Sequence, residues 1–294
     1  MKKTLIVAAT TGALLFGYFF TSSAFAEKRE VLPTVVSVNM PHVLPPNAGG
    51  AGKNNSPAAT SNLTYHNGPV MSASVNVVPL YWGTSWANAS FTGDKIAGLK
   101  SLYAGYNNST YANISTQYLD SSKQSTSKSV TVDSATNIDL SIASSDSTKI
   151  FNKIVEKFSG TLSPNSFYPV YTDIPRGNAG YCAWHSYGTV TQSGITFKVK
   201  FAFFFSLAGD SGCSASYDAS SYSKVTQSLA NVSAHELAEA MTDPELNAWY
   251  DKQGYENADK CAWKFSGVQT LSNGSTWALQ GEWSNATSSC VWSK

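Results

Sequence analysis

The sequence predicts an α+β domain in which a twisted mixed sheet packs on one long helix and a β-rich C-terminal part follows. Residues 195–205 alternate between apolar and polar and then become fully apolar, which is typical of a strand that starts half-exposed and ends buried. Residues 221–242 have the apolar spacing of a helix. Residues 263–292 are rich in aromatic residues and turn formers, which predicts short strands.

The chain before the long helix alternates between strand and helix patterns. Valine and aromatic residues fill 70–82, and Pro79 within that run predicts a bend or a sheet edge. The expected elements are strands at 70–82, 129–133 and 167–172 and helices at 95–103 and 148–158. In the C-terminal part, Ser272-Asn273-Gly274 predicts a hairpin turn.

The first 26 residues have the pattern of a signal peptide. A basic start at Lys2 and Lys3 precedes an apolar run over 5–20, and Ala24-Phe25-Ala26 matches a cleavage site. We therefore expect a mature chain that begins at Glu27 and is exported by a bacterial host, either secreted or kept in the periplasm. No later segment is long and apolar enough to span a bilayer, so we expect no membrane association after cleavage.

Residues 27–62 have the composition of a linker. Several prolines up to Pro46 are followed by an Asn-, Gly- and Ala-rich run over 47–52, and such a composition buries little surface. A removable pro-segment is the alternative. His42 lies in this stretch and is discounted as a site residue. Residues 63–294 are expected to form a single metallohydrolase-like domain.

Charge and cysteine usage narrow the class of protein. The net charge is +1 and only 13% of the residues are charged, which argues against a nucleic-acid groove. Four cysteines in an oxidising compartment indicate two disulfides. Proximity in the sequence favours Cys182–Cys213 and Cys261–Cys290. A zinc–thiolate site is the weaker alternative, because the sequence has no C-x-x-C pair.

The segment His235-Glu236-Leu237-Ala238-Glu239 carries the strongest functional signal. An imidazole at position i and a carboxylate at i+4 lie on one face of a helix, close enough to bind one ion. The pattern is that of the H-E-x-x-H zinc-peptidase helix with glutamate in place of the second histidine. Zincin-like domains have a twisted sheet packed on such a helix, and we therefore expect a zincin-like architecture.

The polar side chains of this motif face the same way as the apolar residues of the helix. At 100° per residue, His235, Glu236 and Glu239 fall in one arc of about 120° with three apolar positions. These positions are Val225, Leu229 and Val232. Buried carboxylates and imidazoles are costly unless they are paired or bind a cation. A metal site is favoured over the alternative, a structural His–Glu hydrogen bond.

A catalytic zinc ion takes three protein ligands and a water molecule. His235 and Glu239 provide two ligands, and Glu256 and Asp259 are the candidates for the third. Asp259 is favoured because a disulfide at Cys261 would hold it firmly. The carboxylates of this region would also suit Ca²⁺, whereas the imidazole favours Zn²⁺.

A reaction follows from this arrangement. Zinc lowers the pKa of a bound water to about 7. Glu236 would act as the general base that takes the proton of this water and passes it to a leaving amine. A donor must stabilise the oxyanion, and His185 and Tyr250 are the candidates. A purely structural role for His185 stays open.

Several stretches, taken in order, resemble the phosphate-induced / Exordium-like family of secreted proteins. They are Tyr65-His66-Asn67-Gly68-Pro69-Val70, Tyr81-Trp82-Gly83, Cys182-Ala183-Trp184-His185, Cys213, His235 to Glu239, Asn247-Ala248-Trp249-Tyr250 and Glu256 to Cys261. The resemblance covers about Tyr65 to Trp263. It departs at Asn67, where the family usually has glycine, and at Asp243, where plant members have asparagine. It implies a secreted protein with a His-Glu-x-x-Glu helix and no defined reaction.

We therefore expect an exported zinc-dependent hydrolase, most specifically a metallopeptidase, that acts on a protein, peptide or cell-wall substrate. A non-catalytic cell-wall or glycan-binding protein of the Exordium-like family is the alternative, because 8 tryptophans and 15 tyrosines in a weakly charged chain suit sugar stacking. A metal-free glycosidase that uses Glu236 and Glu239 ranks last, since these carboxylates are one helical turn apart. The sequence leaves the oligomeric state undefined.

Overall fold

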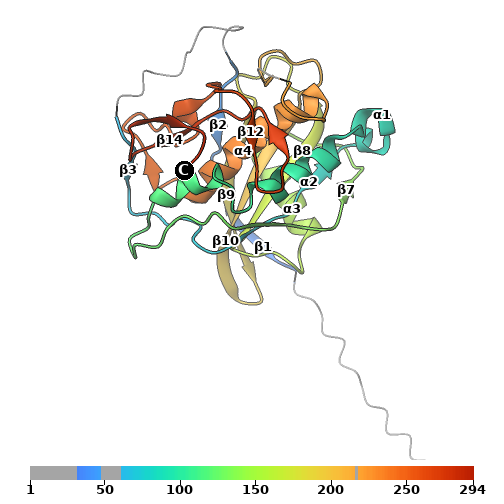
Figure 1. Cartoon of the computed structure of the whole chain (residues 1–294). Coiled ribbons are helices and arrows are strands. Elements are labelled where there is room, and N and C mark those ends of the chain that lie inside the picture. The colour runs from blue at the N-terminus through green and yellow to red at the C-terminus, as the bar shows by residue number, and fades with distance from the viewer. Residues whose placement is uncertain (1–31, 48–60, 216–217) are drawn as a thin grey trace, which may run out of the picture. The chain divides into compact units, whose positions relative to one another are not determined.

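The computed structural model describes residues 32–47, 61–215 and 218–294. The expected signal peptide and the start of the mature chain lie outside these residues. Within them, the chain has an α+β architecture with a nine-stranded mixed sheet and few helices (Figure 1). None of the helices in this described part combines the length and the apolar character needed to cross a membrane.

The large sheet has parallel pairs on one side and antiparallel pairs on the other. Its strands are β1 (Thr34–Val38), β2 (His42–Leu44), β4 (Val75–Val77), β5 (Leu80–Trp82), β6 (Val130–Val132), β7 (Asn137–Asp139), β8 (Ser166–Pro175), β9 (Ala183–Gln192) and β10 (Ile195–Ser206). The main order is β1-β9-β10-β8-β4-β6, while β2 pairs with β9, and β5 pairs with both β7 and β8. Strand β8 pairs in parallel with β4, β5 and β10, whereas β9 pairs antiparallel with β1, β2 and β10.

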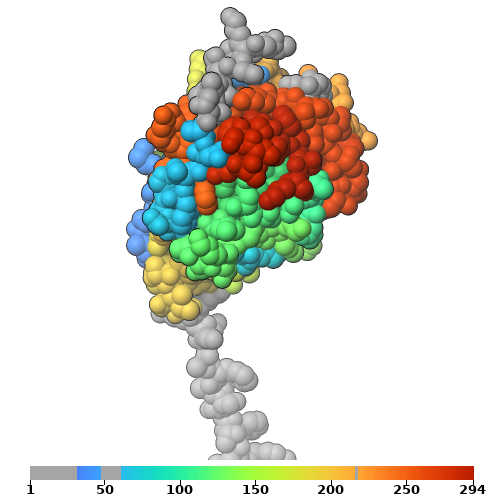
Figure 2. Space-filling view, turned by 60° about the vertical axis from the view of Figure 1, so that its left-hand side comes forward, coloured from blue at the N-terminus to red at the C-terminus, as the bar shows by residue number. Residues whose placement is uncertain are grey.

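The other elements surround this sheet. The helices are η1 (Thr84–Ala87), α1 (Ala89–Thr92), α2 (Lys95–Tyr106), η2 (Ala112–Gln117), α3 (Ser147–Lys157), α4 (Lys224–Thr242) and η3 (Asp259–Cys261). Three small antiparallel pairs join β3 (Thr64–Tyr65) to β11 (Trp249–Tyr250), β12 (Gln269–Thr270) to β13 (Thr276–Trp277), and β14 (Glu282–Ser284) to β15 (Ser289–Val291). Figure 2 shows the red C-terminal segment lying against the green segment that contains η2.

The β9–β10 hairpin determines which side chains face α4. A two-residue turn joins the strands, and both of its residues, Ser193 and Gly194, have positive φ, as the right-handed twist of a hairpin requires. Because side chains alternate along a strand, Trp184 and His185 point to opposite faces of the sheet. Trp184 contacts Phe201 and Phe203, which leaves His185 on the other face.

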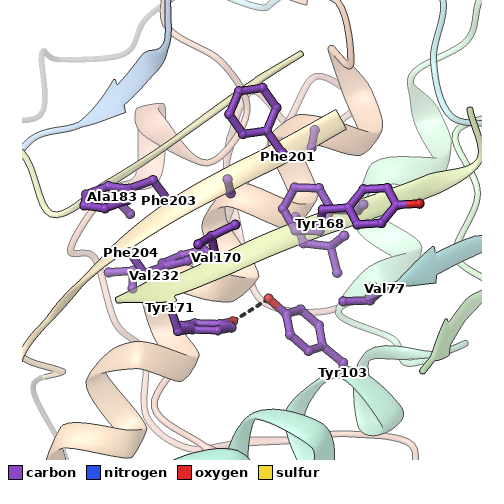
Figure 3. Packing of buried hydrophobic residues seen from close by; sticks show 14 of the residues in the cluster. Val77, Tyr103, Tyr168, Val170, Tyr171, Ala183, Phe201, Phe203, Phe204 and Val232 are labelled. Atoms are coloured by element: carbon purple, nitrogen blue, oxygen red, sulfur yellow. Dashed lines mark hydrogen bonds between the residues drawn. The ribbon is translucent and has the colours of Figure 1, made fainter. Parts of the chain in front are cut away.

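The aromatic core joins the sheet to three helices, and Figure 3 shows part of it. Tyr171 of β8 stacks on Phe204 of β10, with ring centroids 4.6 Å apart. Its hydroxyl lies 2.7 Å from the hydroxyl of Tyr103 on α2 and 2.7 Å from that of Ser233 on α4. On the opposite face, Phe151 of α3 packs on Phe201. Helices therefore cover both faces of the sheet.

Helix α4 is enclosed on all sides. Every residue from Thr226 to Thr242 is buried, because the sheet, α2, η2 and β13 all contact the helix. Where α2 crosses it, a Cβ added to Gly98 would lie 2.3 Å from Cγ2 of Thr226. The predicted apolar stripe is therefore only part of a wholly buried surface, and both motif carboxylates lie in the interior.

Most of the predicted elements are confirmed. Both early helices, the alternating strand β10 and the long helix are present, and the predicted strand over 70–82 divides into β4 and β5 at Val78 and Pro79. Both disulfides, Cys182–Cys213 and Cys261–Cys290, are formed. Such bridges are typical of proteins from oxidising compartments.

Within residues 32–47, the segment predicted to be a linker is different in the structure. Residues 34–38 and 42–44 form β1 and β2, which extend the sheet from β9. Leu44 is fully buried, and its carbonyl accepts a hydrogen bond from the backbone N–H of Cys182 at 2.8 Å. Backbone pairing holds this segment in place, and a composition rich in proline does not reveal that pairing.

The start of α4 depends on a carboxylate from outside the helix. Asp94 accepts hydrogen bonds from the backbone N–H of Ser223 and from the hydroxyl of Thr226, both at 2.5 Å. We expect Asp94→Ala to lower the free energy of unfolding by about 1–2 kcal/mol, because the first turn loses its cap. Urea denaturation measures this loss. Asp218→Ala, at an exposed site, is the control and should change stability by no more than about 0.5 kcal/mol. Equal losses in the two variants would contradict the capping role.

Candidate metal centre

Seven ionisable side chains from separate parts of the described chain gather beside α4. They are His42 on β2, His185 on β9, His235, Glu236 and Glu239 on α4, Glu256, and Asp259 on η3. Six of them are at most 5% exposed. The side chain of His42 is 25% exposed, so the cluster meets solvent at β2.

Helix and strand geometry bring these groups together. His235 and Glu239 are one turn apart on α4, with 3.1 Å between Nε2 and Oε1. His42 and His185 are register partners of β2 and β9, and their ring centroids are 5.7 Å apart. The backbone N–H of Asp259 donates to Oε1 of Glu239 at 3.0 Å, which fixes the start of η3 against the helix.

Each of the other two imidazoles faces a carboxylate at short distance. His42 Nε2 lies 2.6 Å from Oδ2 of Asp259. His185 Nε2 lies 2.7 Å from Oε2 of Glu256 and 3.5 Å from Oε2 of Glu239. Cys261 is two residues after Asp259, and its disulfide with Cys290 anchors this part of the cluster.

The pKa values of three carboxylates in the cluster shift in different directions. Burial raises the pKa of Glu236 well above its usual value. Burial also raises the pKa of Glu256, and the neighbouring Glu239 raises it further. Burial would raise the pKa of Asp259 too, but His42 and His235 hold it well below its usual value.

The pKa values of the three imidazoles also shift in different directions. Burial lowers the pKa of His42, but the Asp259 carboxylate outweighs this effect and raises that pKa to about 9. Burial also works against the charged form of His235, yet Glu239 raises the pKa well above its usual value. Burial, together with His42, lowers the pKa of His185 well below its usual value. Without a cation, the cluster limits its charge by holding protons on part of its members.

Several buried atoms of the cluster lack hydrogen bonds. Both carboxylate oxygens of Glu236, Nε2 of His235 and Oε2 of Glu239 have no hydrogen-bond partner among the described residues. Such atoms are costly in a protein interior, and a bound cation would satisfy them. Ligand-capable atoms of His42, Glu239 and Asp259 lie within 4.8 Å of one another, and so do those of His185, Glu236 and Glu239.

Gln280 controls the orientation of one imidazole. Its Nε2 lies 2.7 Å from Nδ1 of His235 and donates to the carbonyl of Ala258 at 3.0 Å, while its Oε1 accepts from the N–H of Trp263 at 3.2 Å. In this arrangement Nδ1 accepts, and a neutral ring carries its proton on Nε2. A cation at Nε2 requires the opposite tautomer, with Nδ1–H donating. Cation binding by His235 therefore requires the Gln280 amide to turn and present its oxygen.

The structure brings most of the predicted site residues into the cluster, but not all of them. Glu256 and Asp259, the two candidates for the third ligand, both lie in the cluster, and so does His185. Tyr250 lies on β11 instead, where its ring stacks on His66 with centroids 3.6 Å apart. His42, which the sequence analysis discounts, is a member of the cluster. The signal that could have identified its segment is the β-branched run Thr34–Val38 immediately before it.

Comparisons with protein-family models, with curated proteins and with solved structures yield no match for this chain. The resemblance to the Exordium-like family stays a prediction from the motifs and their order.

Proposed function

We propose that this protein is an exported, divalent-metal-dependent hydrolase, with Zn²⁺ as its cation and a peptide bond as its target. One observation carries the proposal. Glu236, His235 and Glu239 have buried atoms without hydrogen bonds to the described residues, and these atoms lie among further imidazoles and carboxylates. An interior of this kind is costly without a cation and is stabilised by one.

We assign four ligands to this cation. They are Glu239, His235, Asp259 and His42. Imidazole nitrogen together with carboxylate oxygen suits Zn²⁺, whereas Ca²⁺ takes oxygen ligands alone. His42 thus joins the ligands expected from the sequence, and zinc remains preferred over calcium.

Glu236 is assigned as the general base. A bound zinc ion would supply a water molecule of lowered pKa. Both oxygens of Glu236 are free of hydrogen bonds to the described residues, and the residue follows His235 directly on the helix. A carboxylate in this position can accept a proton from such a water and transfer it to the leaving amine. The zincin-like architecture expected from the motif belongs to this same proposal.

Burial favours a second candidate, a non-catalytic cell-wall or glycan-binding protein of the Exordium-like family. Six of the seven cluster residues are at most 5% exposed, and a structural metal site is closed in the same way. Such a protein would hold the cation for stability and would bind its partner elsewhere. The two candidates differ in whether metal removal abolishes a reaction or only weakens the fold.

Metal content is the first test. The full-length mature protein, purified from the culture medium without added chelator, is expected to contain zinc in stoichiometric amount by atomic emission. Dialysis against a chelator should abolish cleavage of a peptide library, followed by mass spectrometry, and added Zn²⁺ should restore it. Zinc-free protein that fails to bind added Zn²⁺ would contradict the metal site. Cleavage that survives chelation would contradict the mechanism.

A further inference from the structure

We propose that the cluster binds a second divalent cation beside the first, with Glu239 bridging the two. This inference rests on the proposed function, because it takes the first cation as given. The second site consists of His185 and Glu256 with the remaining oxygen of Glu239. Glu236 borders it.

The two oxygens of Glu239 face different partners. Oε1 lies 3.1 Å from Nε2 of His235 and accepts the backbone N–H of Asp259. Oε2 lies 3.5 Å from Nε2 of His185, is fully buried, and has no hydrogen-bond partner among the described residues. A carboxylate whose oxygens point at separate groups of ligands is suited to bridge two cations.

The second group provides enough ligands for its own ion. His185 Nε2 lies 2.7 Å from Oε2 of Glu256 and 3.5 Å from Oε2 of Glu239, and we take these three groups as the ligands. Three protein ligands and an open position are the usual arrangement around a catalytic zinc. The atoms of Glu236 that could serve as ligands lie within 4.8 Å of those of His185 and Glu239. A water on the second cation would therefore lie within reach of the assigned base.

The number and charge of the groups agree with two ions. Seven ligand-capable side chains meet in the described cluster, while a single zinc uses about three or four. Cation binding requires neutral imidazoles and ionised carboxylates. In that state one dication balances half of the charge of the four carboxylates, and two balance all of it. Paired cations about 3.5–4 Å apart can stabilise both the attacking and the leaving atoms of a displacement.

Cation counting tests this inference in the full-length protein. Metal-free protein titrated with Zn²⁺ by equilibrium dialysis is expected to bind two equivalents. His185→Ala should bind one equivalent, because the substitution removes a ligand of the second site only. His66→Ala is the matched control: this histidine stacks on Tyr250 outside the cluster, and the variant should still bind two. Thermal melting of each metal-free variant verifies that it folds.

A measurement on the unmodified protein provides an independent check. With Mn²⁺ in place of Zn²⁺, two cations bridged by Glu239 are expected to give an exchange-coupled electron paramagnetic resonance spectrum. Saturation at one equivalent, with uncoupled Mn²⁺, overturns the second site but leaves the proposed function intact. Failure to bind any Zn²⁺ overturns both. Two equivalents that persist in His185→Ala exclude the assigned ligands.

Discussion

Glu239→Gln is expected to remove cation binding from the whole cluster and with it all hydrolytic activity. Glu239 is the one residue shared by both groups of ligands, so its loss weakens both sites together. Zinc affinity should fall by more than about 100-fold, since changes to groups that only support a ligand already cost about 10–100-fold. Equilibrium dialysis with Zn²⁺ measures the change directly.

The glutamine variant is a demanding test because it should leave the fold intact. The amide oxygen can still accept the hydrogen bond that the N–H of Asp259 donates at 3.0 Å. Glu245→Gln is the matched control: Glu245 follows α4 and pairs with Lys198 at 2.6 Å, outside the cluster. This control should bind zinc as the unmodified protein does and lose at most about 1 kcal/mol of stability. Normal zinc binding by Glu239→Gln would remove the basis of the proposed site.

The part of the site that lies on α4 and after it is predictable from local sequence. Helical spacing places His235, Glu236 and Glu239 on one side of the helix, and it does so whatever the rest of the chain does. Glu256 and Asp259 follow α4 after a short connection and precede Cys261, whose disulfide is expected, so their return to the helix is also predictable. The sequence favours Asp259 over Glu256 as the third ligand, and the structure brings both residues into the cluster.

The contribution of His42 could not be predicted, because it depends on pairing between distant strands. Its partner His185 is 143 positions later in the chain, and the pairing consists of backbone hydrogen bonds that carry little side-chain signal. Prolines around the segment further obscure it. Strand β9 was missed for a related reason: the stretch from Ala183 to Gln192 contains glycine and polar residues, and it becomes a strand only between β10 and β1.

The expectation that the motif carboxylates are buried is confirmed, although the reason given for it is incomplete. The apolar stripe predicts one buried face of α4, whereas residues 226–242 are buried all round. The stripe therefore did not separate a core face from a solvated face. Both oxygens of Glu236 and Oε2 of Glu239 lack hydrogen bonds within the described residues, and these oxygens lie beside two further imidazoles, which only the structure reveals.

Glu236→Gln is expected to lower the rate of hydrolysis by about 10²–10⁴-fold while the protein keeps its zinc. Glutamine has nearly the same shape but cannot accept a proton from a metal-bound water. Burial raises the pKa of Glu236 well above its usual value, so the neutral amide resembles the protonated side chain of the metal-free protein. In the absence of metal, the variant should therefore have a free energy of unfolding no lower than that of the unmodified protein. The measurements are initial rates, zinc content and urea denaturation.

A second buried glutamate makes this experiment specific. Burial raises the pKa of Glu282 to about 8, and Oε2 of this carboxylate accepts from Ser115 and Asn257. Glu282→Gln therefore replaces a buried carboxylate close to the cluster by an amide and leaves the base in place. The rate of hydrolysis by this variant should stay within about tenfold of that of the unmodified protein. If both variants lose activity equally, the loss reflects general disturbance of the interior. If Glu236→Gln retains full activity, another group accepts the proton and Glu236 is not the general base.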